Sequence, residues 1–182
     1  MKYTILCFVV ALIFATTVKA DQNDPQLDVL FEQLHTIKDE KPGLDITAKI
    51  WSIWHETDDD VTENLLQNGI ALMSTGLNDA ALEMFDRVIE HAPTFAEGWN
   101  KRATVLYLMD RNEDSLYDIR RTLELEPRHF GALSGLGMIY LEAGQYQAAL
   151  VAFKNAEKVN PFPPGIRENI KRLETLIKEK TI

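Results

Sequence analysis

The sequence predicts an all-α fold, a right-handed solenoid of antiparallel helix pairs with an N-terminal helical hairpin and a C-terminal capping helix. Three observations indicate this fold. Pro93, Pro127 and Pro161 recur at a period of 34 residues, and residue types match at corresponding positions between them. Apolar residues on both sides of this region also have helical spacing. A repeat of this length is typical of solenoids, in which each unit buries its apolar face against a neighbour.

Residues 1–20 have the pattern of a secretory signal peptide. A positive start at Lys2 is followed by an apolar run over 5–15 and by a small-residue cleavage site that ends at Ala20. The run is shorter than the roughly 20 residues of a membrane-spanning helix, so an uncleaved anchor is the less favoured alternative. We expect cleavage before Asp21 and a periplasmic or secreted protein.

Composition excludes several classes of function. Beyond residue 20 the chain has 17 basic and 28 acidic residues, a net charge of −11, so it would repel phosphate backbones and attract a basic partner. We therefore expect neither nucleic acid nor an anionic membrane surface as a partner. The single cysteine, Cys7, lies within the signal pattern, so we expect no disulfide and no thiolate metal site in the remainder.

Residues 21–61 are predicted to form a helical hairpin. Its first four residues, 21–24, are a short polar segment that we expect to be disordered. An apolar stripe of helical spacing begins at Leu27, a break follows at 41–43, and a second helix is expected to begin near Asp45.

Counting back one period from the first clear repeat makes residues 28–61 a possible degenerate repeat. Trp51 and Trp54 lie on the apolar face of its second helix. We predict that both pack against the next unit, because apolar stripes on helices are most often core. An exposed aromatic platform for a ligand is the alternative.

Three repeats follow, over 62–95, 96–129 and 130–163. Each is predicted to contain two helices, and its proline ends the second helix because the ring clashes with the preceding turn. Gly76 and Gly144 occupy the turn between the helices, where a left-handed conformation favours glycine. Asp110 takes that position in the middle repeat, where we expect a different or strained turn.

Paired small residues allow the two helices of a repeat to approach closely. The pairs are Gly69 with Ala81, Ala103 with Ser115, and Gly137 with Ala149. A bulky apolar residue follows four positions after each second member, and we expect it to fill the groove between successive repeats. These residues are Phe85, Ile119 and Phe153.

The third repeat carries the residues that indicate a family. The spacing of the tetratricopeptide repeat is matched by Leu136, Gly137, Tyr140, Gly144, Ala149, Phe153, Ala156 and Pro161. The chain therefore resembles that family over roughly its central hundred residues. The resemblance implies an interaction scaffold in which the first helix of each repeat lines a concave groove.

The family register places a mixture of apolar and polar side chains in this groove. The candidate partner-binding residues are Gln67, Ile70, Asn100, Lys101, Thr104, Tyr107, Ser134 and Met138. Such a surface suits a peptide, because Asn100 can pair with peptide amides and Tyr107 offers a large contact area.

Two departures from the family pattern are informative. Some relatives hold the C-terminal carboxylate of a chaperone with lysine, arginine and asparagine, whereas this chain has Leu66, Ile70, Gly131 and Gly135 at four of those positions. A cytosolic chaperone adaptor is therefore disfavoured. Arg102 and Asp118 replace apolar residues in the middle repeat, and we predict a structural ion pair between its two helices rather than a catalytic pair.

Residues 164–182 are predicted to form a capping helix. Its apolar stripe comprises Ile166, Ile170, Leu173 and Ile177, and its other face is charged. Terminal repeats of solenoids require such a polar outer surface.

No catalytic or metal-binding motif is recognisable. The histidines His35, His55, His91 and His129 lack metal-ligand spacing, and the sequence contains neither a glycine-rich phosphate loop nor a nucleophile elbow. We expect that the protein is not an enzyme and that it binds no cofactor and no metal ion. His129 is predicted to be a helix-start residue without a partner, and a contact at the groove edge is the alternative.

The hypothesis is an exported scaffold that binds a protein or peptide partner of the cell envelope through its concave groove. One alternative is a structural subunit that docks into a larger envelope complex through its N-terminal hairpin or convex face. A third, less favoured, is an enzyme or small-molecule carrier that uses the region from Tyr107 to Met138 as a pocket.

Overall fold

The computed structural model describes residues 21–162 and 165–179, and the predicted signal peptide lies outside the described residues. Within these ranges the chain forms helices and no strands. The helices are α1 (Gln26–Thr36), α2 (Glu40–His55), α3 (Asp60–Ser74), α4 (Asn78–His91), α5 (Ala96–Leu108), α6 (Asn112–Leu125), α7 (Phe130–Glu142), α8 (Tyr146–Val159) and α9 (Ile166–Glu179). The predicted all-α fold is confirmed.

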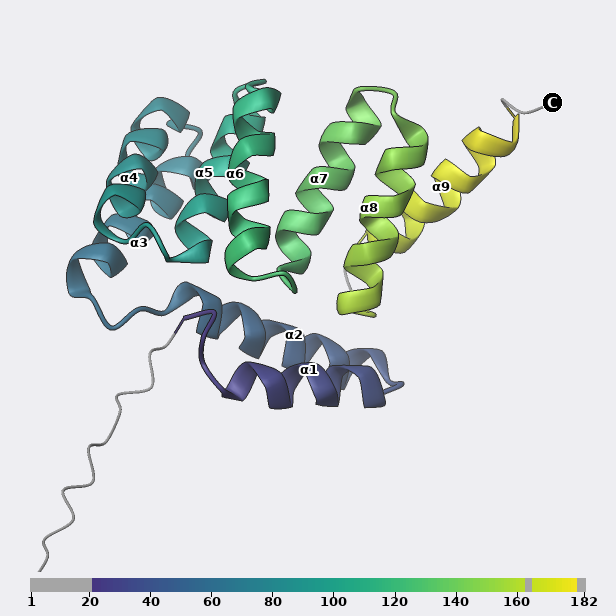
Figure 1. The fold of residues 1–182 in the computed structure, drawn as a ribbon, viewed down its shortest axis with the longest axis horizontal. Helices are drawn as coiled ribbons and strands as arrows, with labels where there is room; N and C mark the ends of the chain where they lie inside the picture. Colours follow the sequence, from purple (N-terminus) through teal and green to yellow (C-terminus); the bar gives the residue numbers. More distant parts are fainter. Residues whose placement is uncertain (1–20, 163–164, 180–182) are drawn as a thin grey trace, which may run out of the picture.

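Three antiparallel pairs, α3 with α4, α5 with α6 and α7 with α8, stand side by side (Figure 1). Successive pairs are joined by packing of α4 on α5 and of α6 on α7. Each second helix ends two residues before its proline, at His91, Leu125 and Val159. The prolines therefore set the spacing of the solenoid, because a helix cannot continue through the residue that precedes a proline without strain.

The turn inside each pair has the same geometry in all three repeats. Gly76 and Gly144 have φ angles of 77° and 69°, and Asp110 has a φ of 59°. The same backbone hydrogen bond closes each turn, as from Arg111 N to Leu106 O at 2.9 Å in the middle repeat. The middle turn is thus not different, and its strain consists of an aspartate in the left-handed region, which aspartate tolerates better than most residues.

The aromatic residues of the second helices, Phe85 and Phe153, contact glycines of their own repeats. A Cβ atom built on Gly137 would lie 2.6 Å from the Phe153 ring, and one on Gly69 would lie 2.5 Å from the Phe85 ring. The glycines therefore provide room for an aromatic ring between the helices of one pair. The same rings also belong to core clusters with the following unit, Phe85 with Phe95 and Val105 and Phe153 with Ile166, Ile170 and Leu173. Ile119 faces Gly135 of the next repeat, so these residues pack both within and between repeats.

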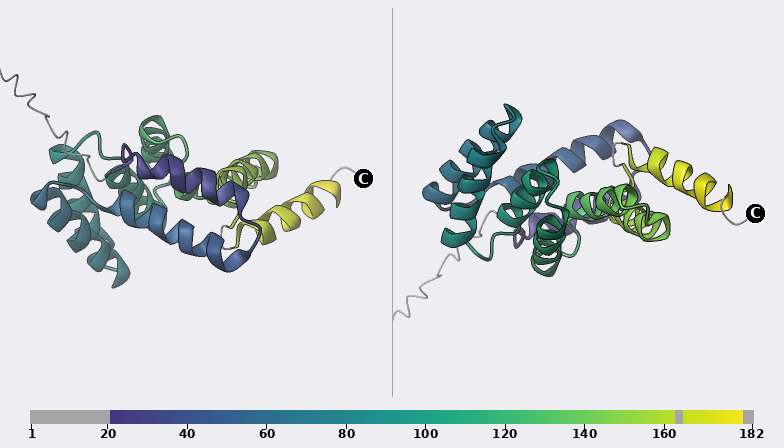
Figure 2. Two further views of the ribbon diagram at one scale, coloured as in Figure 1. Left: turned by 90° about the horizontal axis from the view of Figure 1, so that it is seen from below. Right: turned by 90° about the horizontal axis from the view of Figure 1, so that it is seen from above.

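The hairpin of α1 and α2 crosses the ends of the stacked helices (Figures 1 and 2). Its core includes Leu27, Ile50 and Trp54, and it packs on Phe130 at the start of α7 and on Phe162 after α8. Besides α1, α2 contacts α5, and its Trp51 and Trp54 rings contact Phe130 of α7. This arrangement differs from that of a further stacked repeat, in which the second helix would pack lengthwise on α3.

The segment before α1 is ordered, which contradicts the expectation of a disordered lead. Gln22 is 8% exposed, and its Nε2 donates to the carbonyl of Thr94 at 2.7 Å. The backbone N–H of Ala96 donates to Oε1 of Gln22 at 3.1 Å. Gln22 therefore satisfies a free donor in the first turn of α5, as a capping side chain does.

Helix α9 packs on α8 and buries Ile166, Ile170 and Leu173. It covers the apolar face of the last pair, as expected of a capping helix. Within the described ranges, no helix combines the length and the apolar character needed to cross a membrane.

Candidate functional site

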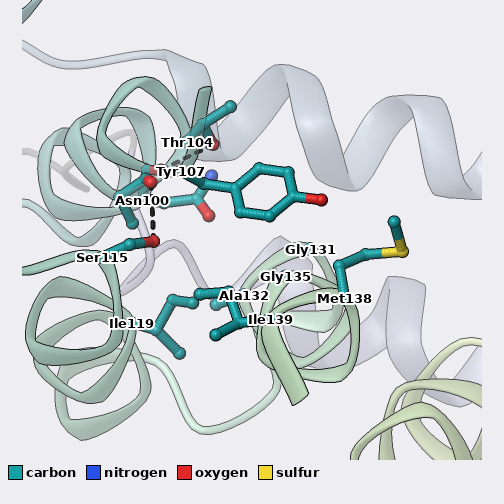
Figure 3. A pocket seen from close by; sticks show the side chains of 11 residues that line it. Asn100, Thr104, Tyr107, Ser115, Ile119, Gly131, Ala132, Gly135, Met138 and Ile139 are labelled. Carbon is teal, nitrogen blue, oxygen red and sulfur yellow. Dashed lines mark hydrogen bonds between the residues drawn. The ribbon is translucent and has the colours of Figure 1, made fainter. Parts of the chain in front are cut away.

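A cavity of about 100 Å³ lies between α5, α6 and α7, on the side formed by the first helices of the second and third repeats (Figure 3). Four of the predicted groove residues line it: Asn100, Thr104, Tyr107 and Met138. Its other lining residues, none of them a predicted partner-binding residue, are Ala103, Ser115, Ile119, Gly131, Ala132, Gly135 and Ile139. The repeat register had placed Gly131 and Gly135 at groove positions and Ile119 between successive repeats, whereas the other four were missed. Most of these side chains are apolar or small, so the floor of the cavity is apolar.

Small side chains explain why the space is empty. The middle repeat carries Ile119 where its neighbours carry Phe85 and Phe153, and α7 presents Gly135 opposite it. A Cβ atom on Gly135 would lie 3.5 Å from Cδ1 of Ile119, an ordinary van der Waals distance. The combination of an isoleucine at this repeat position with a glycine on the next helix is the sequence signal for the cavity.

Tyr107 and Glu142 form the polar rim of this region. The Tyr107 hydroxyl donates a hydrogen bond to the Glu142 carboxylate, which joins the ends of α5 and α7. Desolvation, followed by the hydrogen bond and the charge of Glu142, raises the pKa of Tyr107 to about 12. Tyr107 is thus a neutral donor at physiological pH, and Glu142 brings a negative charge to the rim.

A buried carboxylate lies at the N-terminal end of α5, next to the groove residue Asn100. Glu97, in the first turn of α5, is 1% exposed. Its Oε1 faces Nζ of Lys101 and Nε2 of His55, each at 3.0 Å, and its Oε2 lies 2.9 Å from Nε2 of His129. Asn100 also donates from Nδ2 to Oε2 at 3.0 Å. Burial acts to raise the pKa of Glu97, but Lys101 and the two histidines together hold it well below its usual range.

His129 is fully buried, so it makes no contact at the groove edge; it stands at the start of α7 as predicted, but it has partners, which corrects the expectation of none. Its Nδ1 accepts a hydrogen bond from the backbone N–H of Ala132 at 3.1 Å and thereby caps α7. The proton therefore resides on Nε2, which donates to Glu97. The imidazole stacks on Trp54 with ring centroids 4.2 Å apart.

Trp51 and Trp54 pack inward as predicted, but their ring contacts are with His129 and Phe130 at the start of the third repeat, whereas the prediction placed them against the next unit. Trp54 is 1% exposed. Trp51 contacts His129 edge-on and lies under the Lys101 ammonium, 5.6 Å from the ring centroid. A Cβ atom on Gly131 would lie 2.5 Å from Trp51, so the tryptophan occupies a notch that only glycine leaves open. The hairpin therefore forms one wall of the groove.

The remaining predicted groove residues do not line the cavity. Gln67 is exposed on α3 and donates to Glu63 at 2.9 Å, and Ile70 packs partly into the core of the first repeat. Ser134 donates to the carbonyl of Phe130 on its own helix. Lys101 belongs to the buried network around Glu97.

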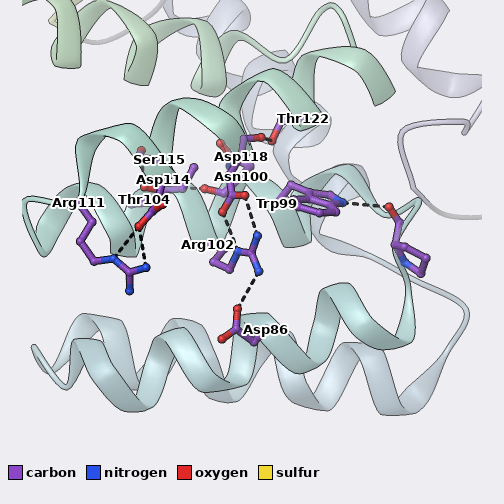
Figure 4. A network of polar contacts seen from close by, with 12 residues as sticks. Asp86, Trp99, Asn100, Arg102, Thr104, Arg111, Asp114, Ser115, Asp118 and Thr122 are labelled. Carbon is purple, nitrogen blue, oxygen red and sulfur yellow. Dashed lines mark hydrogen bonds and ion pairs between the residues drawn. The ribbon is translucent and has the colours of Figure 1, made fainter.

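Arg102 bridges three helices on the other side of α5 (Figure 4). Its Nε and Nη2 donate to the two oxygens of Asp118 at 2.7 and 2.8 Å, and Nη1 donates to Asp86 at 2.8 Å. The structure thus places the predicted ion pair in contact and adds Asp86 from α4. Hydrogen bonds to Asp118 raise the pKa of Arg102, whereas burial raises the pKa of Asp118 despite the guanidinium. Arg102 also stacks on Trp99 at 5.0 Å, which is a structural role.

No group of three or more histidine, cysteine, aspartate or glutamate side chains in the described part of the chain is arranged to hold a metal ion.

Comparisons with known proteins identify the family. A family model described as tetratricopeptide repeat matches residues 101–162. A TPR repeat-containing protein of Rhizobium etli is 33% identical over 148 residues, which cover 81% of this chain and 72% of that protein. The chain belongs to the tetratricopeptide repeat (TPR) family.

Other relatives match a smaller part of the chain. Anaphase-promoting complex subunit 3 of Schizosaccharomyces pombe is 31% identical over 44% of this chain, but the match spans 12% of that protein. The TPR domain of Sgt2 from Aspergillus fumigatus superposes with a TM-score of 0.63 at 18% identity, over 68% of this chain and 83% of that one. The first TPR domain of Spaghetti (RPAP3), bound to the HSP90 peptide SRMEEVD, gives a TM-score of 0.63 at 13% identity, over 66% and 96% of the two chains.

Proposed function

We propose that this TPR protein is an exported scaffold that binds a peptide segment of a cell-envelope protein on the face formed by α3, α5 and α7. The observation that carries the proposal is the cavity between α5, α6 and α7, with its apolar floor and its Tyr107–Glu142 rim. An apolar pocket with a few polar groups at its edge is the usual form of a recognition site.

The TPR domain of Spaghetti provides a precedent for the kind of ligand, since its structure contains a bound HSP90 peptide. At 13% identity that likeness concerns the fold, so the identity of the ligand must come from the residues of this chain. The pattern of residues 1–20 supports export, and a chain without cysteine beyond them can fold in an oxidising compartment without disulfides.

Docking through the aromatic residues of the hairpin is less well supported. Trp54 is buried against His129, and Trp51 fills the notch at Gly131. Trp54 is therefore inaccessible to a partner while the hairpin remains packed, and Trp51 is only partly exposed.

Crosslinking in the native host tests the proposal. The tagged protein would be crosslinked in its own compartment and the attached partners identified, with Tyr107→Ala as the groove variant. Tyr117→Ala is the matched control, because Tyr117 is 50% exposed on α6 and lies outside the cavity. We expect capture of one partner to be lost with Tyr107→Ala and kept with Tyr117→Ala. Equal capture by both variants would show that the groove is not the binding surface.

Export is tested separately by cell fractionation and N-terminal sequencing. The proposal requires a mature protein that begins at Asp21 and is found outside the cytosol. Recovery of the intact chain from the cytosol would refute it.

A further inference from the structure

We propose that the cavity accepts one aliphatic side chain from a positively charged segment of the partner, with a flanking lysine or arginine of that segment placed over Tyr107 and paired with Glu142. This inference rests on the proposed function and specifies the chemistry of the peptide that the groove selects.

The size of the cavity selects the side chain. An apolar cavity of about 150 Å³ holds a benzene ring. The present cavity, at about 100 Å³, is smaller, and Ile119 and Ile139 limit it on two sides. It therefore suits leucine, isoleucine, valine or methionine better than phenylalanine or tryptophan. Most of its lining is apolar, so a polar side chain that lost its water there would regain few hydrogen bonds, and polar residues are disfavoured.

The charges at the rim select the flanking residues. The positive charge of Lys101 is paired with Glu97, and its ammonium lies over the Trp51 ring. Glu142 is exposed, and it keeps its negative charge while it accepts the hydrogen bond from Tyr107. A cation above the Tyr107 ring would gain both the ring quadrupole and the carboxylate. The net charge of −11 beyond residue 20 attracts such a segment at longer range.

The same residues disfavour an acidic ligand. The peptide SRMEEVD in the Spaghetti complex carries three acidic residues among its last four. In this chain Gly131 and Gly135 supply no cation to the groove, and Lys101 is already paired with Glu97. A carboxylate-rich peptide would meet Glu142 without a compensating charge. The internal segment of a partner is therefore a better match than an acidic C-terminus.

Fluorescence anisotropy with defined peptides tests the inference. The probe is a short fluorescein-labelled peptide with one central leucine flanked by lysines. Its variants replace the leucine with alanine or tryptophan, or the lysines with glutamates. We expect alanine or tryptophan in place of leucine to weaken binding roughly tenfold, since several buried methyl and methylene groups are lost or excluded. We expect the glutamate probe not to bind, and binding of the lysine probe to weaken as salt is raised.

Variants of the protein locate the binding site. Gly135→Leu places a side chain in the cavity, and Gly135→Ala is its milder counterpart at the same position, since the added Cβ fits beside Ile119. Glu142→Gln removes the rim charge, and Glu83→Gln makes the same change on exposed α4. Binding of the leucine probe should fall at least tenfold with Gly135→Leu and severalfold with Glu142→Gln, and should be unchanged with Glu83→Gln. Circular dichroism and thermal melting establish that each variant is folded.

Two results would overturn the inference. One is tighter binding of the glutamate probe or the tryptophan probe. The other is equal binding of the leucine probe to a folded Gly135→Leu variant. If the partner captured in the host still depends on Tyr107, the proposed function stands and only the chemistry assigned to the peptide is wrong. If capture is independent of Tyr107, the proposed function itself fails.

Discussion

A pair of glycine substitutions on one helix tests how the hairpin is held. Gly131 and Gly135 lie one turn apart on α7 and both line the cavity. A Cβ atom on Gly131 would lie 2.5 Å from Cη2 and 3.0 Å from Cζ2 of Trp51, distances too short to be tolerated without movement. A Cβ atom on Gly135 would lie 3.5 Å from Cδ1 of Ile119, which requires no movement. The same chemical change therefore has opposite consequences.

The magnitudes follow from packing and helix propensity. Gly135→Ala is expected to stabilise the protein by about 0.5–1 kcal/mol, because alanine favours the helix interior over glycine. Gly131→Ala forces the Trp51 ring out of its notch, and overpacking of this kind costs about 1–3 kcal/mol. That ring also contacts Trp54, Phe130 and His129, so its displacement weakens the packing of α2 against the start of α7.

Urea unfolding and tryptophan fluorescence measure the difference. Gly131→Ala should lower the free energy of unfolding and change the native fluorescence spectrum, whereas Gly135→Ala should raise the free energy slightly. In thermal melts, each 1 kcal/mol corresponds to a change in Tm of about 2–4 °C for a domain of this size. If Gly131→Ala were as stable as Gly135→Ala, with the native spectrum unchanged, Trp51 could not occupy the notch and the hairpin would be placed differently.

Three further outcomes are expected. Glu97→Ala should destabilise the protein by about 3–5 kcal/mol, because it leaves buried cationic and imidazole groups without their acceptor. Glu83→Ala on the surface should change the free energy of unfolding by no more than about 0.5 kcal/mol in the same urea assay. The folded structure lowers the pKa of Glu97 below its usual 4.5, so the contribution of Glu97 to stability is present above that pH and is lost as the pH falls further. Urea titrations at decreasing pH should therefore show a weaker loss of stability in Glu97→Gln than in the parent protein. An identical pH dependence would contradict the assignment. Gln22→Ala removes the hydrogen-bond partner of the Ala96 N–H and of the Thr94 carbonyl, and it should lower the free energy of unfolding by about 1–2 kcal/mol. Asn23→Ala is the exposed neighbouring control. Amide hydrogen exchange should accelerate at the start of α5 in Gln22→Ala only.

Much of the repeat region could be predicted from the sequence because it depends on local rules. The prolines end helices wherever they stand, and the turn position requires a left-handed residue whether glycine or Asp110 fills it. The contact between Arg102 and Asp118 was predictable for a related reason, since both stand at positions that repeat geometry brings together. In a solenoid each unit contacts its neighbours, so the period of the sequence specifies most contacts.

The candidate site was predicted only in part. Asn100, Thr104, Tyr107 and Met138 share the cavity, but the register of the first helices could not show that α6 supplies part of its wall. Whether a space exists there depends on how the volumes of several side chains add up across three helices, and periodicity carries no information on that sum.

The sequence by itself determined the helices, their pairing and the family of the protein, because those follow from patterns that repeat every 34 residues. The tertiary structure alone decided where the hairpin lies and what Glu97, His129 and Trp51 do. These residues meet across separations outside the repeat, as Gln22 meets Thr94 from 72 positions away. Their contacts result from the complementarity of one notch, one buried charge and one helix end, which no repeating pattern encodes.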